Sequence, residues 1–246
     1  MRIGIVSDIH ANLPAFVRVM TKLAEYGATA HLWCIGDVVG YGPHPNECLD
    51  LLREHEHLCV PGNHDWGTIG RTDPGLFNDI ALWALNWTKA RLSAGNHAYL
   101  EALPMTIPLR DQPFTLVHGS PRDPIWEYLV ESEEAAPNFP LFTTPYCLVG
   151  HTHLPRIFRH HADGTVTARQ PQAGELLPLG PDRLIINPGS VGQPRDGDPR
   201  AHYAVLDTTA GTILFDRVEY PVVLTQARMR DWGFPAGLIA RLEIGV

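Results

Sequence analysis

Short polar clusters follow six apolar, strand-like runs in this 246-residue chain. In order, they are Asp8-Ile9-His10, Gly36-Asp37, Gly62-Asn63-His64-Asp65, His118-Gly119, Gly150-His151-Thr152-His153 and Asn187-Pro188-Gly189-Ser190. The first three runs alternate with segments whose apolar residues recur at helical spacing, and this β-α-β-α-β order predicts parallel strands. Because parallel strands end at one edge of an open α/β sheet, the clusters are expected to meet there.

The remaining elements are expected in two blocks. The first contains strands at 3–7, 31–35, 58–60, 114–117 and 146–149, a helix capped by Asn12 and ended by Gly27, a helix at 45–54, and helical structure over 74–103. After His153 come short runs at 156–159, 165–168, 184–187, 203–206 and 212–218, separated by Gly, Asp and Pro turns. This spacing predicts a meander-like antiparallel section. The region 224–244 is predicted to be helical, with a break at 233–235.

Composition sets limits on class and location. A hydrophobic content of 44% without a break in composition predicts one domain over residues 1–246. A net charge of −8 argues against strong nucleic-acid binding, although a groove made positive by metals could still attract short nucleic acids. The four cysteines are widely spaced and are expected to be buried thiols. With no signal peptide or membrane-length apolar run, the protein is expected to be soluble and cytoplasmic.

The cluster residues have the chemistry of a metal site. Asp8 and His10 lie two positions apart at a strand end, so extended geometry projects both to one side. A carboxylate with an imidazole suits Mn²⁺, Fe, Zn²⁺ or Ni²⁺ better than Ca²⁺ or Mg²⁺. Asp37 follows one βα unit later, where its carboxylate could bridge two cations roughly 3.5–4 Å apart. The further candidate ligands are Asn63, His118, His151 and His153.

These ligands suffice for two divalent transition-metal ions with open positions, and Mn²⁺ is the expected metal. A metal-bound hydroxide would then attack phosphorus in line with the leaving oxygen. His64 is expected to protonate the leaving alkoxide or stabilise charge on the phosphoryl oxygens. Asp65 is expected to orient His64 by accepting its other N–H. The predicted activity is metal-dependent hydrolysis of a small phosphoester.

The same clusters resemble those of the calcineurin-like metallophosphoesterases, from Met1 to about Tyr203. Three segments look like the small bacterial and archaeal phosphodiesterase branch: 36–43 (GDVVGYGP), 118–122 (HGSPR) and 187–192 (NPGSVG). No motif position departs from the family's ligand pattern. The resemblance implies a four-layer αββα sandwich of two mixed β-sheets flanked by helices. It also implies one metal on Asp8, His10, Asp37 and His153, a second on Asp37, Asn63, His118 and His151, and His64 as the proton donor.

Substrate contacts are harder to assign. Arg122, Arg195 and Arg200 could each bind a phosphate bidentately, and Arg195 is the best candidate of the three. Tyr41 could stack on an aromatic group, as could Trp126 and Tyr128, although packing is the better explanation for each of them. The Asn187–Ser190 segment is explained by turn chemistry alone or by a place beside the substrate.

Hydrolysis of phosphodiesters is the first functional hypothesis. A phosphomonoesterase or protein phosphatase with the same site is the alternative within this chemistry. A non-catalytic protein-binding scaffold, as in the retromer subunit of this fold, is disfavoured because the full ligand set and His64 are present. A nuclease acting on DNA ends is disfavoured by the charge and the length. The apolar stripes of 74–103 fit either burial within the domain or a dimer contact, so the oligomeric state stays open.

Overall fold

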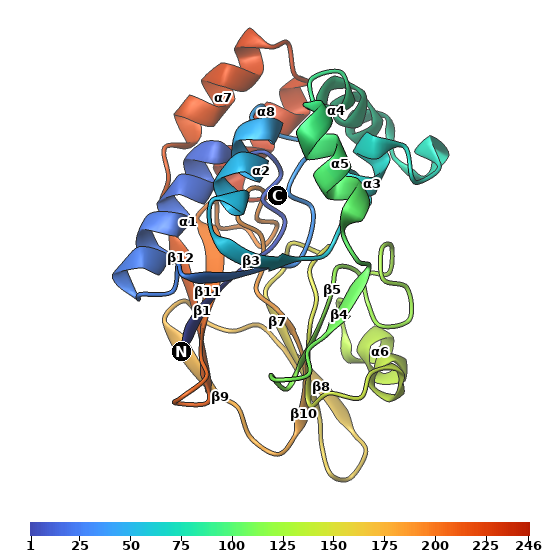
Figure 1. Cartoon of the computed structure of the whole chain (residues 1–246), viewed down its shortest axis with the longest axis vertical. Helices are drawn as coiled ribbons and strands as arrows, with labels where there is room; N and C mark the ends of the chain where they lie inside the picture. Colours follow the sequence, from blue (N-terminus) through green and yellow to red (C-terminus); the bar gives the residue numbers. More distant parts are fainter.

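Two six-stranded mixed β-sheets form the centre of the computed structural model, which describes residues 1–246 (Figure 1). The first sheet has the order β3-β2-β1-β11-β12-β9. Its strands are β1 (Arg2–Val6), β2 (His31–Cys34), β3 (Glu56–Cys59), β9 (Glu175–Pro178), β11 (Ala201–Asp207) and β12 (Thr212–Val218). β1, β2 and β3 are parallel, as predicted, whereas β11 and β12 extend the sheet in antiparallel fashion.

The second sheet has the order β4-β5-β6-β10-β7-β8. Its strands are β4 (Thr106–Pro108), β5 (Phe114–Val117), β6 (Tyr146–Leu148), β7 (Arg156–His160), β8 (Val166–Arg169) and β10 (Arg183–Asn187). β5, β6 and β10 are parallel, and the other pairs are antiparallel. The parallel strands of both sheets therefore end in the loops that carry the polar clusters.

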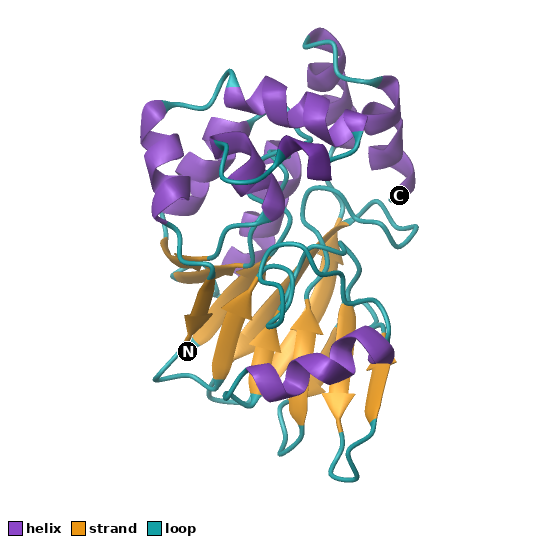
Figure 2. Ribbon diagram, turned by 90° about the vertical axis from the view of Figure 1, so that its right-hand side faces the viewer, coloured by secondary structure: helices purple, strands orange, loops and turns teal.

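Helices cover the outer faces of both sheets (Figure 2). They are α1 (Leu13–Glu25), α2 (Pro45–Arg53), α3 (Asn63–Ile69), α4 (Asp79–Lys89), α5 (Ala94–Ala102), α6 (Ser132–Ala135), α7 (Val222–Asp231) and α8 (Ala236–Ile244), with 3₁₀ turns η1 (Pro74–Leu76) and η2 (Ala136–Leu141). Only α6 and η2 lie on the second sheet, and the others gather around the first (Figures 1 and 2). None of these helices combines the length and apolarity needed to cross a membrane.

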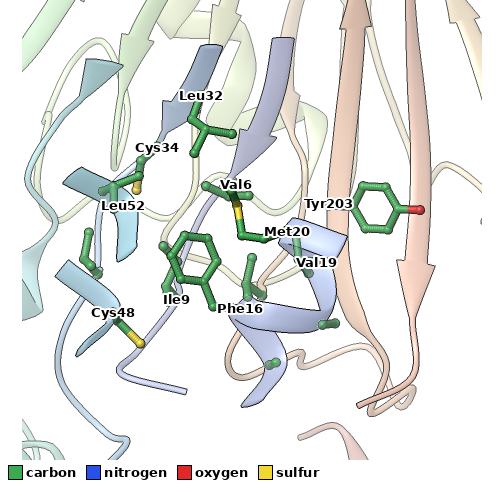
Figure 3. Packing of buried hydrophobic residues seen from close by; sticks show 14 of the residues in the cluster. Val6, Ile9, Phe16, Val19, Met20, Leu32, Cys34, Cys48, Leu52 and Tyr203 are labelled. Carbon is green, nitrogen blue, oxygen red and sulfur yellow. The ribbon is translucent and has the colours of Figure 1, made fainter. Parts of the chain in front are cut away.

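Side chains alternate between the two faces of each strand, so each sheet packs against the other sheet on one face and against helices on the other. In β1, Ile3 and Ile5 point between the sheets, while Val6 points toward α1. In β6, Tyr146 and Leu148 likewise face the first sheet. Figure 3 shows Phe16, Val19 and Met20 of α1 packed beside Val6. The predicted αββα sandwich is therefore confirmed.

Three details differ from the sequence prediction. The region 74–103 is broken into η1, α4 and α5, because Asn78 and Ser93 cap the starts of α4 and α5. The strands after His153 do not form one meander: β9 and β10 are consecutive but belong to different sheets, and β10 pairs parallel with β6. α3, β4 and β9 were not predicted. The predicted cap of α1 at Asn12 is confirmed, and Gly27, with a positive φ, follows the last residues of that helix. The predicted break at 233–235 separates α7 from α8.

Phe16 provides a direct test of the α1 interface. Its side chain is fully buried, whereas its neighbour Val17 is 45% exposed. We expect Phe16→Ala to lower the free energy of unfolding by about 3–5 kcal/mol, because a cavity is added to the lost transfer energy. Val17→Ala is the matched control and should change it by less than about 0.5 kcal/mol. Urea denaturation measures both, and equal effects would contradict this packing.

Candidate metal centre

All seven predicted ligands meet at the carboxyl ends of the parallel strands. Asp8 and His10 follow β1, Asp37 follows β2, and Asn63 begins α3 directly after β3. The second sheet contributes His118 after β5, and His151 and His153 after β6. Each of the seven side chains is nearly completely buried. Two sheets thus contribute to a single cluster, which none of the strands could form alone.

The ligand atoms fall into two groups that share one carboxylate. Asp8, His10, Asp37 and His153 form one group, and Asp37, His118 and His151 form the other. Within each group the potential ligand atoms lie within 4.8 Å of one another. Asp37 Oδ2 is 3.7 Å from His10 Nε2 and 3.4 Å from His118 Nε2. Asp37 therefore lies where a carboxylate shared by two cations would be needed.

Backbone carbonyls orient the imidazoles. Nδ1 of His10 lies 3.2 Å from Val39 O, Nδ1 of His118 lies 2.7 Å from Ile35 O, and Nδ1 of His153 lies 2.6 Å from Gln193 O. Since a carbonyl can only accept, each Nδ1 carries the proton and each Nε2 keeps its lone pair. His151 is reversed, because its Nε2 lies 3.1 Å from Trp126 O and leaves Nδ1 free.

These tautomers bring lone pairs together. Nε2 of His10 and Nε2 of His153 are 3.0 Å apart. With both protons held on Nδ1, neither Nε2 can donate to the other, so the contact is repulsive unless a cation lies between them. This contact favours a metal ion bound to both nitrogens.

Four buried acceptors have no hydrogen-bond partner. They are Asp8 Oδ1, Asp37 Oδ2, Asn63 Oδ1 and His118 Nε2. Buried polar atoms left without a partner are costly, and a group of acceptors alone cannot satisfy itself. Carboxylate and amide oxygens mixed with imidazole nitrogens are the donor set of divalent transition metals. The residues present therefore fit such ions.

Burial and mutual charges shift the pKa values in this cluster. Burial raises the pKa of Asp8 to about 7, against the opposing effect of His118. Burial also acts to raise the pKa of Asp37, but His118 and His64 outweigh it and hold that pKa well below its usual range. For His118, burial acts to lower the pKa, but the charge of Asp37 overcomes it and raises the pKa to about 10. Without a metal ion His118 Nε2 therefore also carries a proton, which a bound cation would displace to use the nitrogen lone pair. Asp37 is thus the ionised group at the centre.

The backbone is strained at the same place. Every non-glycine residue with positive φ lies in or beside the cluster: Asp8, His10, Ala11, Asp37, Tyr41, His151 and His153. A left-handed conformation costs an L-residue about 1–2 kcal/mol. Cross-links between the loops hold it, such as His10 N–H donating to Asp37 O at 2.9 Å and Asp8 N–H donating to Gly36 O at 3.0 Å.

His64 lies beside the cluster, but Asp65 does not orient it as predicted. The His64 ring lines a cavity of about 70 Å³, with its Nδ1 buried and without a partner. Burial lowers its pKa to about 4, with partial opposition from Asp37. The Asp65 carboxylate instead accepts the N–H groups of Gly62 (2.9 Å) and Val39 (3.1 Å), so it caps α3. Contacts with the rings of His10, Tyr41 and Phe77 fix the His64 ring.

Of the candidate substrate residues, some line the cavity beside His64 and others are held in ion pairs. Arg195 and Tyr41 line the cavity beside His64, and the Arg195 guanidinium carbon is 6.0 Å from the centre of the Tyr41 ring. Arg122 is exposed and pairs with Glu127, and Arg200 pairs with Asp198. The cavity is also lined by Trp126 and Tyr128, and the Tyr128 ring centre lies 3.9 Å from that of His151.

The Asn187–Ser190 turn joins the site loops together. Ser190 Oγ donates to Asp8 O at 2.8 Å, and Asn187 Nδ2 donates to Gly150 O at 2.7 Å. His202 supports this turn, because its Nδ1 accepts the N–H of Ser190 at 3.1 Å. The polar side chains of this segment therefore hold the turn against the loops that carry Asp8 and His151. No sequence signal distinguishes His202, since its contact depends on pairing between distant segments.

Comparisons with known proteins agree with this geometry. Residues 1–211 match the calcineurin-like phosphoesterase superfamily domain. The fold superposes on the crystal structure of a metallophosphoesterase from Sphaerobacter thermophilus with a TM-score of 0.89 and 49% identity, covering 100% of this chain and 99% of the other. An uncharacterised protein of Methanocaldococcus jannaschii is 34% identical over 99% of this chain and 98% of its own length. Phosphodiesterase YfcE of Escherichia coli is 28% identical over 87% of this chain and 91% of its own.

The fold and the buried acidic and histidine cluster define a metal-dependent hydrolase of phosphoric esters. This chain belongs to the calcineurin-like phosphoesterase superfamily.

Metal binding should stabilise the folded protein through Asp37. Mn²⁺ added to chelator-treated protein at a concentration about 100 times the Kd of the metal should raise the free energy of unfolding by about 2.7 kcal/mol. The corresponding rise in Tm is roughly 5–10 °C. We expect Asp37→Asn to lose most of this rise, because the shared negative charge is removed. The exposed Asp163→Asn is the control. Calorimetric melts with and without Mn²⁺ measure the effect, and an unchanged rise in Asp37→Asn would exclude this site.

His202 should make the fold sensitive to acid. Burial lowers its pKa to about 4, partly opposed by Asp196, whereas the unfolded value is about 6.5. Between these values the unfolded chain binds a proton that the folded chain does not, so stability falls as pH falls from 6.5 to 4. The loss attributable to His202 should reach about 3 kcal/mol.

His202→Asn keeps an acceptor near the position of Nδ1 but does not titrate. Its free energy of unfolding should therefore fall less steeply over this pH range than that of the wild type. The partly exposed His55→Asn serves as the control and should keep the wild-type slope. Parallel slopes for all three proteins in pH-dependent urea denaturation would contradict the assignment.

Proposed function

We propose that this protein hydrolyses phosphodiesters with two divalent transition-metal ions. One ion would be held by Asp8, His10, Asp37 and His153, and the other by Asp37, Asn63, His118 and His151. The observation that supports this most strongly is the pair of ligand groups sharing Asp37, in which the buried acceptors lack any other partner. A single domain over residues 1–246 is part of the proposal.

When bound, such ions lower the pKa of water and neutralise charge on the phosphoryl oxygens. The protein's own residues then have separate tasks. Three backbone carbonyls each keep one imidazole in a single tautomer and orientation: Val39 holds His10, Ile35 holds His118 and Gln193 holds His153. Their positions are fixed before substrate arrives, so little reorganisation is needed during reaction.

His64 is the proposed proton donor. Its Nδ1 has no acceptor, which favours the tautomer with the proton on Nε2, the nitrogen left available to a substrate in the cavity. With a pKa near 4 the ring is neutral at pH 7. It would therefore act by donating a hydrogen bond from its Nε2–H to the leaving oxygen, which stabilises the negative charge that develops there. It would give up a proton to that oxygen only from the imidazolium form.

Arg195 and Tyr41 are proposed to position the substrate. Arg195 Nε is buried without a partner at the edge of the same cavity, so a phosphoryl oxygen could accept from it. The Tyr41 ring lies 4.2 Å from that of His64 and supports its orientation. The cavity of about 70 Å³ is small, so the larger part of an ester arm would extend outside it.

A diester is favoured because a relative over 87% of the chain is named as a phosphodiesterase. The test is hydrolysis of bis(p-nitrophenyl) phosphate and p-nitrophenyl phosphate after reconstitution with Mn²⁺. We expect metal-dependent cleavage with preference for the diester. Preference for the monoester would identify a phosphatase with the same site, and absence of turnover with Mn²⁺, Fe, Zn²⁺ or Ni²⁺ despite metal binding would refute the proposal.

Replacement of His64 separates proton donation from metal binding. His64→Ala should lower kcat for the diester by roughly 10²–10⁴-fold, because the leaving oxygen loses its donor. Mn²⁺ affinity measured by calorimetry should change far less, since His64 belongs to neither ligand group. His97→Ala, at a histidine outside the cavity, is the matched control. Wild-type kcat in His64→Ala would remove His64 from the mechanism.

A further inference from the structure

A second, larger hollow adjoins the cavity of the metal centre. It has a volume of about 510 Å³, and Tyr41 and Asn78 line both this hollow and the first cavity. Its other lining residues come from α4 and α8, and they include Asp79 and Arg241. Because the first cavity is much the smaller of the two, the part of a substrate that extends past Tyr41 would enter this hollow.

Arg241 gives the hollow a positive charge. Its Nε donates to the main-chain oxygen of Val246 at 2.6 Å, and its terminal guanidinium nitrogens make no hydrogen bond within the protein. No aspartate or glutamate side chain pairs with it, whereas Arg200 and Arg217 are both held by Asp198. Burial and the neighbouring charge of Arg195 both lower the pKa of Arg241, as expected for two cations close together.

Arg195 lies near the Tyr41 ring in the cavity of the metal centre. One of its terminal nitrogens donates to Gln193 Oε1 at 3.0 Å, and its buried Nε has no partner. Arg195 therefore lines the cavity of the metal centre, and Arg241 lines the adjoining hollow. The one acidic side chain that lines either hollow outside the metal ligands, Asp79, is exposed to solvent at the start of α4. Two partly buried, unpaired arginines of this kind favour an anion.

The end of α8 holds Arg241 in place. Gly245 adopts a positive φ of 67°, and its carbonyl accepts the N–H of Gly197 at 2.9 Å. A Cβ at Gly245 would approach within 2.6 Å of the Asp198 backbone, so only glycine permits this contact. The loop that carries Arg195 and the helix that carries Arg241 are thereby joined.

We propose that Arg241, together with Arg195, forms a second anion subsite, which selects phosphoesters whose non-scissile arm carries a further phosphate. This proposal rests on the proposed function, since it names the substrate class of the same site. The further phosphate would replace the missing hydrogen-bond partners and relieve the repulsion between the two guanidiniums.

A matched pair of substrates tests the subsite. The p-nitrophenyl ester of thymidine 5′-phosphate and its 3′-phosphorylated counterpart differ only in the second phosphate. We expect kcat/KM of the wild type with Mn²⁺ to be roughly tenfold or more higher for the 3′-phosphorylated ester, mainly through KM. Arg241→Gln should reduce this ratio to near one, and Arg230→Gln, at an exposed unpaired arginine on α7, should keep it.

Equilibrium binding gives a readout without turnover. Titration calorimetry of thymidine 3′,5′-bisphosphate and thymidine 5′-phosphate into chelator-treated protein should show the same preference, and Arg241→Gln should abolish it. Circular dichroism melts confirm that both variants fold. A wild type that cleaves both esters equally, or an Arg241→Gln protein that retains the preference, would overturn the subsite and leave the proposed function intact. Failure to cleave either ester would refute the proposed function, while the calorimetric comparison would still decide the subsite.

Discussion

The carboxylate of Asp37 faces two imidazole groups with one oxygen and the start of a helix with the other. Oδ2 lies between His10 and His118, while Oδ1 accepts the N–H of His64 at 2.8 Å. The second contact requires that Gly62 lack a side chain, because a Cβ there would overlap Asp37 Oδ1. One ionised group thus fixes both the centre of the ligand cluster and the place where α3 begins. The position of Asn63 and the orientation of His64 follow from that start.

Loops of this shape would not persist by themselves. Left-handed conformations at seven non-glycine residues, together with buried acceptors facing each other, oppose the folded arrangement. The two-sheet core and the cross-links from Ser190 to Asp8 and from Asn187 to Gly150 offset this cost. Bound cations would satisfy the same acceptors. The loops that carry the conformational strain are therefore the loops that carry the candidate metal ligands. This distribution is expected where a site is organised before its ligand arrives.

Local patterns in the sequence were sufficient to bring the candidate ligands to one edge of the sheets, whereas the αββα sandwich followed from the family resemblance. Each ligand follows an apolar run, and parallel strands necessarily bring such ends together. Three features depend on information that a single sequence does not contain. Alternation in β9 and β10 shows which residues face inward but not which sheet each strand joins. Asp65 fits equally well as a partner of His64 or as a helix cap, and only the start of α3 at Asn63 decides between them. His202 and Arg241 reach the site through tertiary contacts of distant segments.

The topology separates the candidate metal ligands from the proposed anion subsite. All seven candidate ligands lie within residues 1–211, which match the superfamily domain, whereas α7 and α8 lie beyond that region. These two helices are packed onto α4 through Met229, Phe234 and Leu238, and α8 thereby places Arg241 beside Tyr41. Tyr41 in turn contacts the rings of His10 and His64. A change in α8 can therefore alter what enters past Tyr41 without moving a strand end, so selectivity could diverge among relatives while the ligand cluster stays the same.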